Sequence, residues 1–203
     1  MTSELKIPTT FLVPTAIFLA VTSFLSFFFD KVELHLALNV WKHPVSDVFF
    51  KYITHLGDGL IFVPFILYFG FKKNWEYFFL FTSTAVITLI ITALGKSVLF
   101  PNIDRPILAI GTDKLQLVEG VRMHSKYSFP SGHTMAAFAF WSLIAVIAPK
   151  KIGYLFSLIA ILVGISRVYL SQHFVPDVAA GGLLGILISH FCVRLVKVFY
   201  PKK

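Results

Sequence analysis

Three short stretches of this chain carry side chains that could together bind and attack a tetrahedral oxyanion. They supply fixed positive charge, a serine and a glycine before an apolar run, two histidines and one carboxylate, which suit anion binding, proton transfer and nucleophilic attack. The stretches are Lys96 with Arg105–Pro106, then Pro130–Ser131–Gly132–His133, then Ser166–Arg167 with His173 and Asp177. Because the rest of the chain is strongly apolar, the pattern indicates a phosphorylated lipid as the ligand.

The cations of the first and third stretches suit a phosphate. The guanidinium groups of Arg105 and Arg167 can each bind two phosphate oxygens, and Lys96 adds a compact third charge. A phosphoryl transition state spreads negative charge over three oxygens, so three fixed donors would stabilise it. A lysine at a helix end often only reaches for lipid headgroups, which is sufficient to explain Lys96 taken alone. Arg167 is harder to explain in that way, because it follows a long apolar run and lies six residues before His173.

The second stretch has the features of a helix start that binds an anion. Ser131 is a typical N-cap residue, and Gly132 lets a ligand approach the backbone closely. Free N–H groups and the helix dipole favour a negative ligand there, although the same residues would also serve as a plain cap. A protonated histidine in the first turn opposes the dipole, so His133 favours the functional interpretation: a general acid that protonates a leaving oxygen.

His173 and Asp177 form a candidate nucleophile and its partner. A carboxylate that holds one imidazole nitrogen fixes the tautomer and leaves the other nitrogen free to attack. Pro176 suits the first turn of a helix, so Asp177 has the alternative role of a helix-start acid favoured by the dipole. An ionisable pair at the border of an apolar core favours the functional role.

The composition places the chain in a membrane. Of its 203 residues 57% are hydrophobic and only 14% are charged, with a mean hydropathy of +0.80, whereas a soluble domain carries about a quarter charged residues. The cations behind the net charge of +8 flank apolar runs or belong to the three stretches, which argues for a bilayer and against a nucleic acid as partner. No linker divides the chain, so we expect one domain over residues 1–203, and the single cysteine, Cys192, excludes an intrachain disulfide.

The apolar runs predict an all-α integral membrane protein with six transmembrane helices. A span needs about 20 apolar residues, and the first run is too long for a signal peptide, so we expect it to be retained. One run is short and contains Pro64, so it would tilt or borrow length from the helix before it. The expected spans are residues 11–29, 59–73, 75–99, 133–148, 152–170 and 176–199.

Residues 45–56 predict an amphipathic helix at the membrane surface. Apolar and polar side chains segregate to opposite helical faces there, and Gly57–Asp58–Gly59 then breaks the helix. Two interpretations stay open, a helix packed on the bundle and part of a lateral gate that admits lipid.

Lysine and arginine outside the three stretches predict the orientation. The tight turns at Lys72–Lys73 and Lys150–Lys151 belong on the cytoplasmic side. We therefore expect a multi-pass protein of the cell membrane with both termini cytoplasmic. All three chemical stretches then reach the extracytoplasmic face.

The stretches resemble the signature of the type 2 phosphatidic acid phosphatase superfamily, K-x6-RP, then PSGH, then SR-x5-H-x3-D. The second and third match residue for residue, whereas eight residues, not six, separate Lys96 from Arg105, so that a bulge at Pro101–Asn102 would have to accommodate the excess. The resemblance covers about residues 50–195. Within the family, the expected six-span length and the short loops are most similar to those of bacterial phosphatidylglycerophosphate phosphatases and their undecaprenyl-pyrophosphate phosphatase relatives.

The resemblance implies a two-step hydrolysis without a metal or other cofactor. His173 would attack phosphorus with the help of Asp177, and His133 would protonate the lipid alkoxide and then activate water. The sequence agrees, since the three stretches hold one carboxylate and offer no magnesium site. The phosphoryl oxygens would be held by Lys96, Arg105, Ser131, Gly132 and Arg167.

Several alternatives remain at this point. Phosphatidylglycerophosphate is the first choice of substrate by similarity, followed by undecaprenyl pyrophosphate and phosphatidic acid. A vanadate-dependent haloperoxidase would use the same anion pocket, but six apolar runs argue against that soluble class. A non-catalytic lipid binder would need neither His173 nor His133, and the sequence leaves the oligomeric state open.

Overall fold

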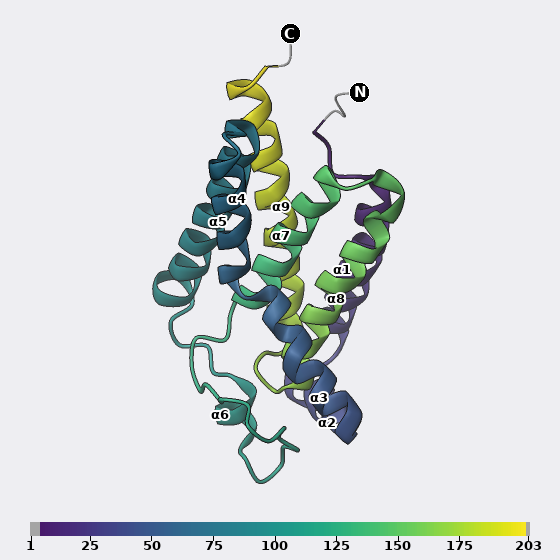
Figure 1. The fold of residues 1–203 in the computed structure, drawn as a ribbon. Coiled ribbons are helices and arrows are strands. Elements are labelled where there is room, and N and C mark those ends of the chain that lie inside the picture. The colour runs from purple at the N-terminus through teal and green to yellow at the C-terminus, as the bar shows by residue number, and fades with distance from the viewer. Residues whose placement is uncertain (1–4, 202–203) are drawn as a thin grey trace.

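Four apolar runs form helices long enough to cross a membrane. The computed structural model describes residues 5–201, and within that range the chain is all helical, without strands (Figure 1). The four are α1 (Thr9–Phe28), α5 (Trp75–Leu94) continued by the π-helical η3 (Gly95–Leu99), α8 (Gly153–Tyr169) preceded by the short 3₁₀ helix η4 (Lys150–Ile152), and α9 (Val175–Phe199).

A fifth candidate span is a bent pair of helices. The first arm is α3 (Pro44–Ile53) with η1 (Thr54–Gly57), and the second is η2 (Gly59–Ile61) with α4 (Phe62–Phe71). The pair is bent by 56° at the break between them. At the bend, a Cβ added to Gly57 would lie 2.7 Å from the carbonyl oxygen of His133, so only glycine fits. Trp141 fixes the same corner, because its indole N–H donates to the Leu56 carbonyl at 3.0 Å.

The sixth expected span is α7 (Gly132–Ile147), and it is short. Its 16 residues rise about 24 Å, less than the hydrocarbon core of about 30 Å. The described chain therefore offers four or five spans by length and composition, and the expected count of six is not reached on that basis.

Helix α7 is instead the centre of the bundle. Most of its side chains are buried, and it packs between α8 and α9. Close approach to α9 depends on two glycines one turn apart, since a Cβ at Gly181 or Gly185 would lie about 2.5 Å from a carbonyl oxygen of the Ser131–Met135 segment. Small residues permit this kind of crossing in membrane helices.

The amphipathic segment forms α3 with its polar side toward the protein. Val45, Val48 and Tyr52 are exposed, whereas Asp47 accepts a hydrogen bond from the Tyr169 hydroxyl at 2.6 Å. This helix therefore packs on the bundle with an apolar outer face. Its position at a membrane surface stays a prediction.

The remaining helices lie at one end of the molecule. They are α2 (Lys31–Asn39) and α6 (Pro106–Ile110), the latter inside the long connection from α5 to α7. Figure 1 shows that the start of α1 and the end of α9 lie at the opposite end. The end of α5, the start of α7, the end of α8 and the start of α9 therefore all face the loops around α6. These four points and the start of α6, where Arg105 is the N-cap, carry the three chemical stretches.

Candidate active site

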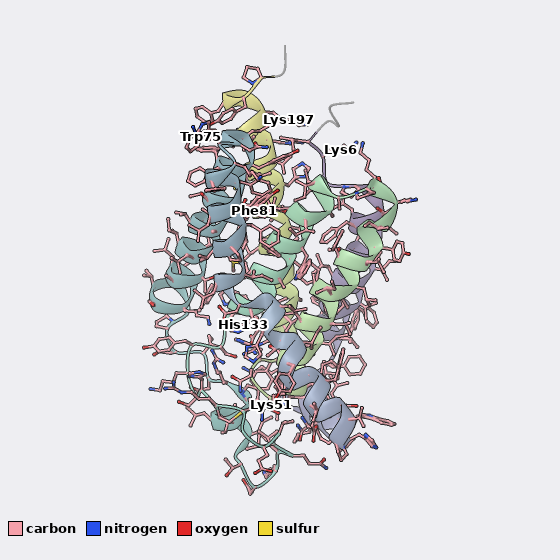
Figure 2. All side chains as sticks on the ribbon, in the orientation of Figure 1. Lys6, Lys51, Trp75, Phe81, His133 and Lys197 are labelled. Carbon is pink, nitrogen blue, oxygen red and sulfur yellow. The ribbon has the colours of Figure 1, made fainter. Side chains whose placement is uncertain are left out.

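A cavity of about 430 Å³ opens where those helix ends meet the loops. It lies between α3, the α5–α7 connection and the α8–α9 turn, and Figure 2 shows His133 between the bundle and the loops around α6. Five of the eight predicted site residues line it, namely Lys96, Arg105, His133, Arg167 and His173. The structure therefore brings together residues that are up to 77 positions apart in the sequence.

His173 is held with one ring nitrogen toward a carboxylate. Its Nδ1 lies 3.3 Å from Asp177 Oδ2, and both side chains are almost completely buried. Because Nδ1 faces Asp177 and the ring lines the cavity, Nε2 is the nitrogen available for attack. Burial, followed by the charges of Arg105, Arg167 and Lys96, lowers the pKa of His173 well below its usual value, so the imidazole is neutral and can act as a nucleophile.

Ser128 is a site residue that sequence reasoning missed. Its hydroxyl donates to Asp177 Oδ2 at 2.5 Å, and the Phe174 N–H donates to the same oxygen at 3.0 Å. These two bonds are shorter than the one between Asp177 and His173, so Ser128 and the backbone fix the carboxylate that orients the imidazole. Ser128 lies three residues before Ser131 in the sequence, but no motif spacing predicts its contact with Asp177, which is 49 positions away.

The two arginines are buried and only partly engaged by the protein. Arg167 Nη1 donates to Thr54 Oγ1 at 2.7 Å, whereas its buried Nε has no hydrogen-bond partner in the described chain. Arg105 donates from Nε to the Lys126 carbonyl and from Nη1 to Gln172, which leaves its Nη2 free to donate. An orphaned buried donor is costly, so Arg167 Nε fits an anion in the cavity.

Lys96 reaches the site despite the longer spacing. The turn of η3 that carries it is π-helical, and a turn follows at Pro101–Asn102, so two local irregularities accommodate the extra residues. Its ammonium lies 3.8 Å from the point where a Cβ on Gly132 would stand. The lysine and the helix start of α7 therefore face the same space.

The start of α7 has the expected cap. Ser131 is the N-cap and accepts from the Thr134 N–H at 3.4 Å, and its hydroxyl is also paired with the Thr134 hydroxyl at 2.8 Å. Ser131 N–H donates to the Asp177 carbonyl at 3.0 Å, which ties the start of α7 to the start of α9. Ser131 is thus engaged in capping, while Gly132 and His133 line an adjoining cavity; a phosphate contact from Ser131 stays a prediction.

A second layer of residues holds the loop that carries His173. On α2, His35 Nε2 and Asn39 Nδ2 each lie 3.1 Å from the Ser171 hydroxyl, and Ser171 has a positive φ of 52°. The His35 ring also meets the Phe174 ring edge to face. Neither residue gave a sequence signal, because each is linked to this loop only through the fold.

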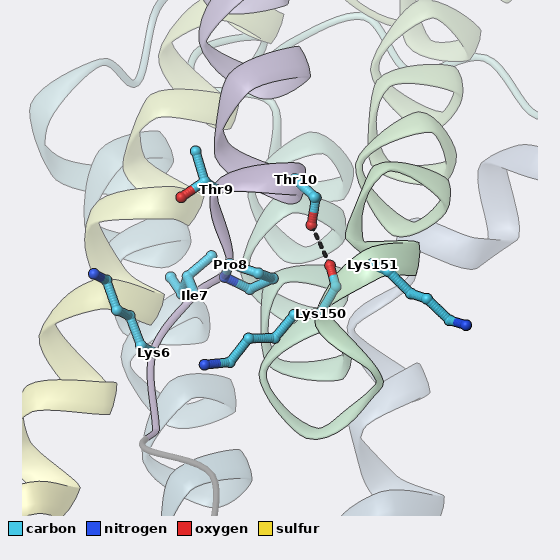
Figure 3. Close-up of a pocket in the computed structure, with 7 residues that line it drawn as sticks. All are labelled: Lys6, Ile7, Pro8, Thr9, Thr10, Lys150 and Lys151. Atoms are coloured by element: carbon cyan, nitrogen blue, oxygen red, sulfur yellow. Dashed lines mark hydrogen bonds between the residues drawn. The ribbon is translucent and has the colours of Figure 1, made fainter.

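Two other cavities help to define the site. One of about 480 Å³ is mainly apolar, lies between the α3–α4 bend and α5, and shares Lys96 and His133 with the polar cavity. The other, of about 310 Å³, lies at the end of the molecule that carries the start of α1 and is lined by Lys6, Lys150 and Lys151 (Figure 3). No histidine or arginine is among the described residues that line this cavity, so those residues do not offer the groups for phosphoryl transfer.

Comparison with known proteins agrees with this geometry. The sequence profile described as the PAP2 superfamily matches residues 62–200. Phosphatidylglycerophosphatase B of Bacillus subtilis (strain 168) is 34% identical over 168 residues, which cover 74% of this chain and 73% of that protein.

Two solved structures share the fold. The PAP2 type phosphatidylglycerolphosphate phosphatase of Bacillus subtilis has a TM-score of 0.68 at 25% identity, over 97% of this chain and 99% of that one. LpxE of Aquifex aeolicus has a TM-score of 0.70 at 26% identity, over 82% of this chain and 97% of that one.

A helical membrane fold with a cation-lined histidine pocket defines a class of membrane-embedded phosphatases. The chain belongs to the PAP2 superfamily. The prediction of an enzyme of the lipid phosphate phosphatase class is confirmed at this level, and so is a multi-pass membrane protein. The substrate, the roles of the individual site residues and the orientation in the membrane stay predictions.

Proposed function

We propose that this chain hydrolyses phosphatidylglycerophosphate to phosphatidylglycerol and phosphate. The similarity to phosphatidylglycerophosphatase B, over about three quarters of both chains, supports this substrate ahead of the others. The observation that carries the chemistry is the buried His173–Asp177 pair at the wall of a cavity with an unpartnered arginine donor. A lipid binder would need the donor but not the nucleophile.

The proposed first step transfers the phosphoryl group to His173. Nε2 forms a bond to phosphorus while the bond from phosphorus to the lipid oxygen breaks, and His133 gives its proton to that oxygen. Lys96, Arg105, Arg167 and the Gly132 N–H would hold the other phosphoryl oxygens, with Ser131 supporting the helix start. The apolar cavity beside His133 would take the lipid part of the leaving group.

The proposed second step releases phosphate. His133, now neutral, takes a proton from water, the water oxygen attacks phosphorus, and the bond to His173 breaks. Asp177, fixed by Ser128, would stabilise the cationic phosphohistidine between the two steps. The residues assign no step to a metal, and no three His, Cys, Asp or Glu side chains gather as a metal site in residues 5–201.

We also propose the six-span topology with both chain ends in the cytoplasm, as a single domain over residues 1–203. In Figure 1 the chain crosses the bundle along α1, α4, α5, α7, α8 and α9 in turn, with α7 as a short central pass. Lysines gather at the end with the start of α1, as Figure 3 shows for Lys6, Lys150 and Lys151. Positive charge on the cytoplasmic side then places the cavity on the outer face.

The test is phosphate release by the purified protein in detergent with EDTA present. We expect turnover of phosphatidylglycerophosphate with a higher kcat/KM than that of phosphatidic acid or undecaprenyl pyrophosphate. His173→Ala should bind the lipid but not turn it over. Loss of activity with EDTA, or the same activity in His173→Ala, would overturn the proposal.

A further inference from the structure

The polar cavity holds more positive charge than one phosphate requires. Besides Lys96, Arg105 and Arg167, it is lined by Lys51 of α3 and Arg122 of the α5–α7 connection, and no carboxylate is among the described lining residues. A phosphate monoester brings about two negative charges near neutral pH. The three inner cations already exceed that charge, so Lys51 and Arg122 remain without an assigned anion.

Lys51 is fixed at the outer part of this cavity. Its ammonium donates to the Glu119 carbonyl at 2.9 Å, which uses one of three donors. Gly120 has a positive φ of 71°, and a Cβ there would stand 2.5 Å from the Lys51 ammonium, so the lysine occupies the place of a side chain on that turn. Figure 2 shows Lys51 farther than His133 toward the loop end.

The same turn brings Arg122 to the cavity. Lys51 contacts Glu119 and Gly120, two to three residues before Arg122, and both cations belong to residues that line the cavity. His124 lines this part too. Its pKa is lowered by burial and then by the charges of Arg105 and Arg122, so both arginines lie close enough to affect the same imidazole. His124 is therefore neutral, and the extra positive charge comes from Lys51 and Arg122.

We propose that Lys51 and Arg122 form a second anion subsite that selects lipids with two phosphate groups. The inference rests on the proposed phosphatase activity and adds a specificity to it. With the terminal phosphate on the inner cations, the second phosphate of phosphatidylglycerophosphate or of a pyrophosphate lipid binds the outer pair. Phosphatidic acid has one phosphate and leaves Lys51 and Arg122 unused.

The test compares Lys51→Gln, Arg122→Gln and the double variant with the unaltered enzyme in mixed micelles. The measured quantity is the ratio of kcat/KM for phosphatidylglycerophosphate to that for phosphatidic acid. Each single change removes one charge-assisted contact, so we expect the ratio to fall about tenfold, mainly through KM. Lys114→Gln is the control, because it removes one positive charge from the α5–α7 connection at a residue that does not line the cavity. This change should leave the ratio of kcat/KM values unaltered.

Two further measurements keep the result interpretable. Inhibition by vanadate reports on the inner site, so a variant that still binds vanadate is folded there. The ratio of kcat/KM for undecaprenyl pyrophosphate to kcat/KM for phosphatidic acid repeats the comparison with a lipid whose two phosphates are directly joined. If the unaltered enzyme turns over the pyrophosphate lipid and not phosphatidylglycerophosphate, the proposed function fails, and a fall of this second ratio in the variants supports the subsite.

The subsite is overturned by either of two results. One is an unaltered enzyme that prefers phosphatidic acid to both two-phosphate lipids. The other is that the variants retain inhibition by vanadate but show no change in the ratio of kcat/KM values. The ratio is unchanged if activity falls equally on one-phosphate and two-phosphate lipids, or if it does not fall on either.

Discussion

At the scale of single residues, the site depends on how its nucleophile and cations are held. One carboxylate oxygen, Asp177 Oδ2, faces the Ser128 hydroxyl, the Phe174 N–H and His173 Nδ1, with the longest distance to the histidine. Ser128 and the Phe174 N–H thus hold the carboxylate in the position from which it orients the imidazole. Arg105 is held in the same manner by Gln172, which stands next to the nucleophile in the chain.

Ser128→Ala should lower kcat about tenfold or more. It removes the shorter hydrogen bond to an ionised carboxylate, and such bonds contribute about 1.5–3 kcal/mol. Ser128→Thr keeps the hydroxyl and should recover much of the loss. Steady-state phosphate release checks both variants; full activity in Ser128→Ala would show that Asp177 needs no such support.

Arg105→Gln should move the acid limb of kcat/KM to higher pH. Burial is the main cause of the low pKa of His173, and the charge of Arg105 is the next. Without that charge the pKa of His173 rises, so the neutral nucleophile is lost at a higher pH as the solution becomes more acidic, and the acid limb of kcat/KM moves to higher pH.

The pH profile of the unaltered enzyme is the reference for this shift. The substrate phosphate titrates near pH 6 in both enzymes and so cancels in the comparison. An acid limb in Arg105→Gln that is unmoved, or moved to lower pH, would contradict the assignment.

At the scale of elements, short helices outside the spans position the site. Helix α2 contacts the Ser171 hydroxyl through His35 and Asn39 and so supports the turn that carries Gln172 and His173. Burial and then the charge of Lys42 lower the pKa of His35 to about 4, so this contact is made by a neutral imidazole. The α3–α4 bend acts on the other wall, where Thr54 accepts a hydrogen bond from Arg167.

His35→Ala should lower kcat several-fold with little change in KM. Ser171 loses one of its two side-chain contacts from α2, and a hydrogen bond of this kind contributes about 1 kcal/mol. His35→Gln can still bond Ser171 and should restore kcat. If both variants raise KM and lower the amount of folded protein alike, His35 serves only stability.

At the scale of the whole molecule, a short central helix sets the depth of the site. Because α7 rises about 24 Å, the helix is too short to reach from one membrane surface to the other, and we expect the phosphate site at its start to be recessed behind the loops around α6. The adjoining apolar cavity then lies beside the bundle and suits a lipid chain. A polar cavity beside the loops and an adjoining apolar cavity would together suit the proposed amphipathic substrate.

The proposed orientation is testable by labelling from outside the cell. In a Cys192→Ser background, Lys114→Cys in the long connection should react with a membrane-impermeant maleimide on intact cells. Lys72→Cys in the α4–α5 turn should react only after the cells are opened. Reaction of Lys72→Cys on intact cells would invert the topology.

The sequence motifs identified side chains that the structure brings to one cavity, whereas the predicted number of spans is not reached by length and composition. Ser131, His133, Arg167 and His173 lie in contiguous motifs, and helix ends bring such motifs together once the spans are placed. Ser128, Gln172 and His35 could not be found, since their contacts join segments up to 136 positions apart and follow no period. The predicted count of six spans is not confirmed, because α7 is apolar but short, and because Gly57 lies at the bend of the α3–α4 pair.

The most direct test of the account is to trap the phosphorylated enzyme. The purified protein is mixed briefly with lipid that carries a labelled terminal phosphate, and the reaction is quenched in alkali. We expect protein-bound label that survives alkali, is released by acid, maps to His173 and is absent from His173→Ala. Label on any other residue, or rapid turnover without bound label under conditions where hydrolysis of the intermediate is slow, would contradict the histidine mechanism.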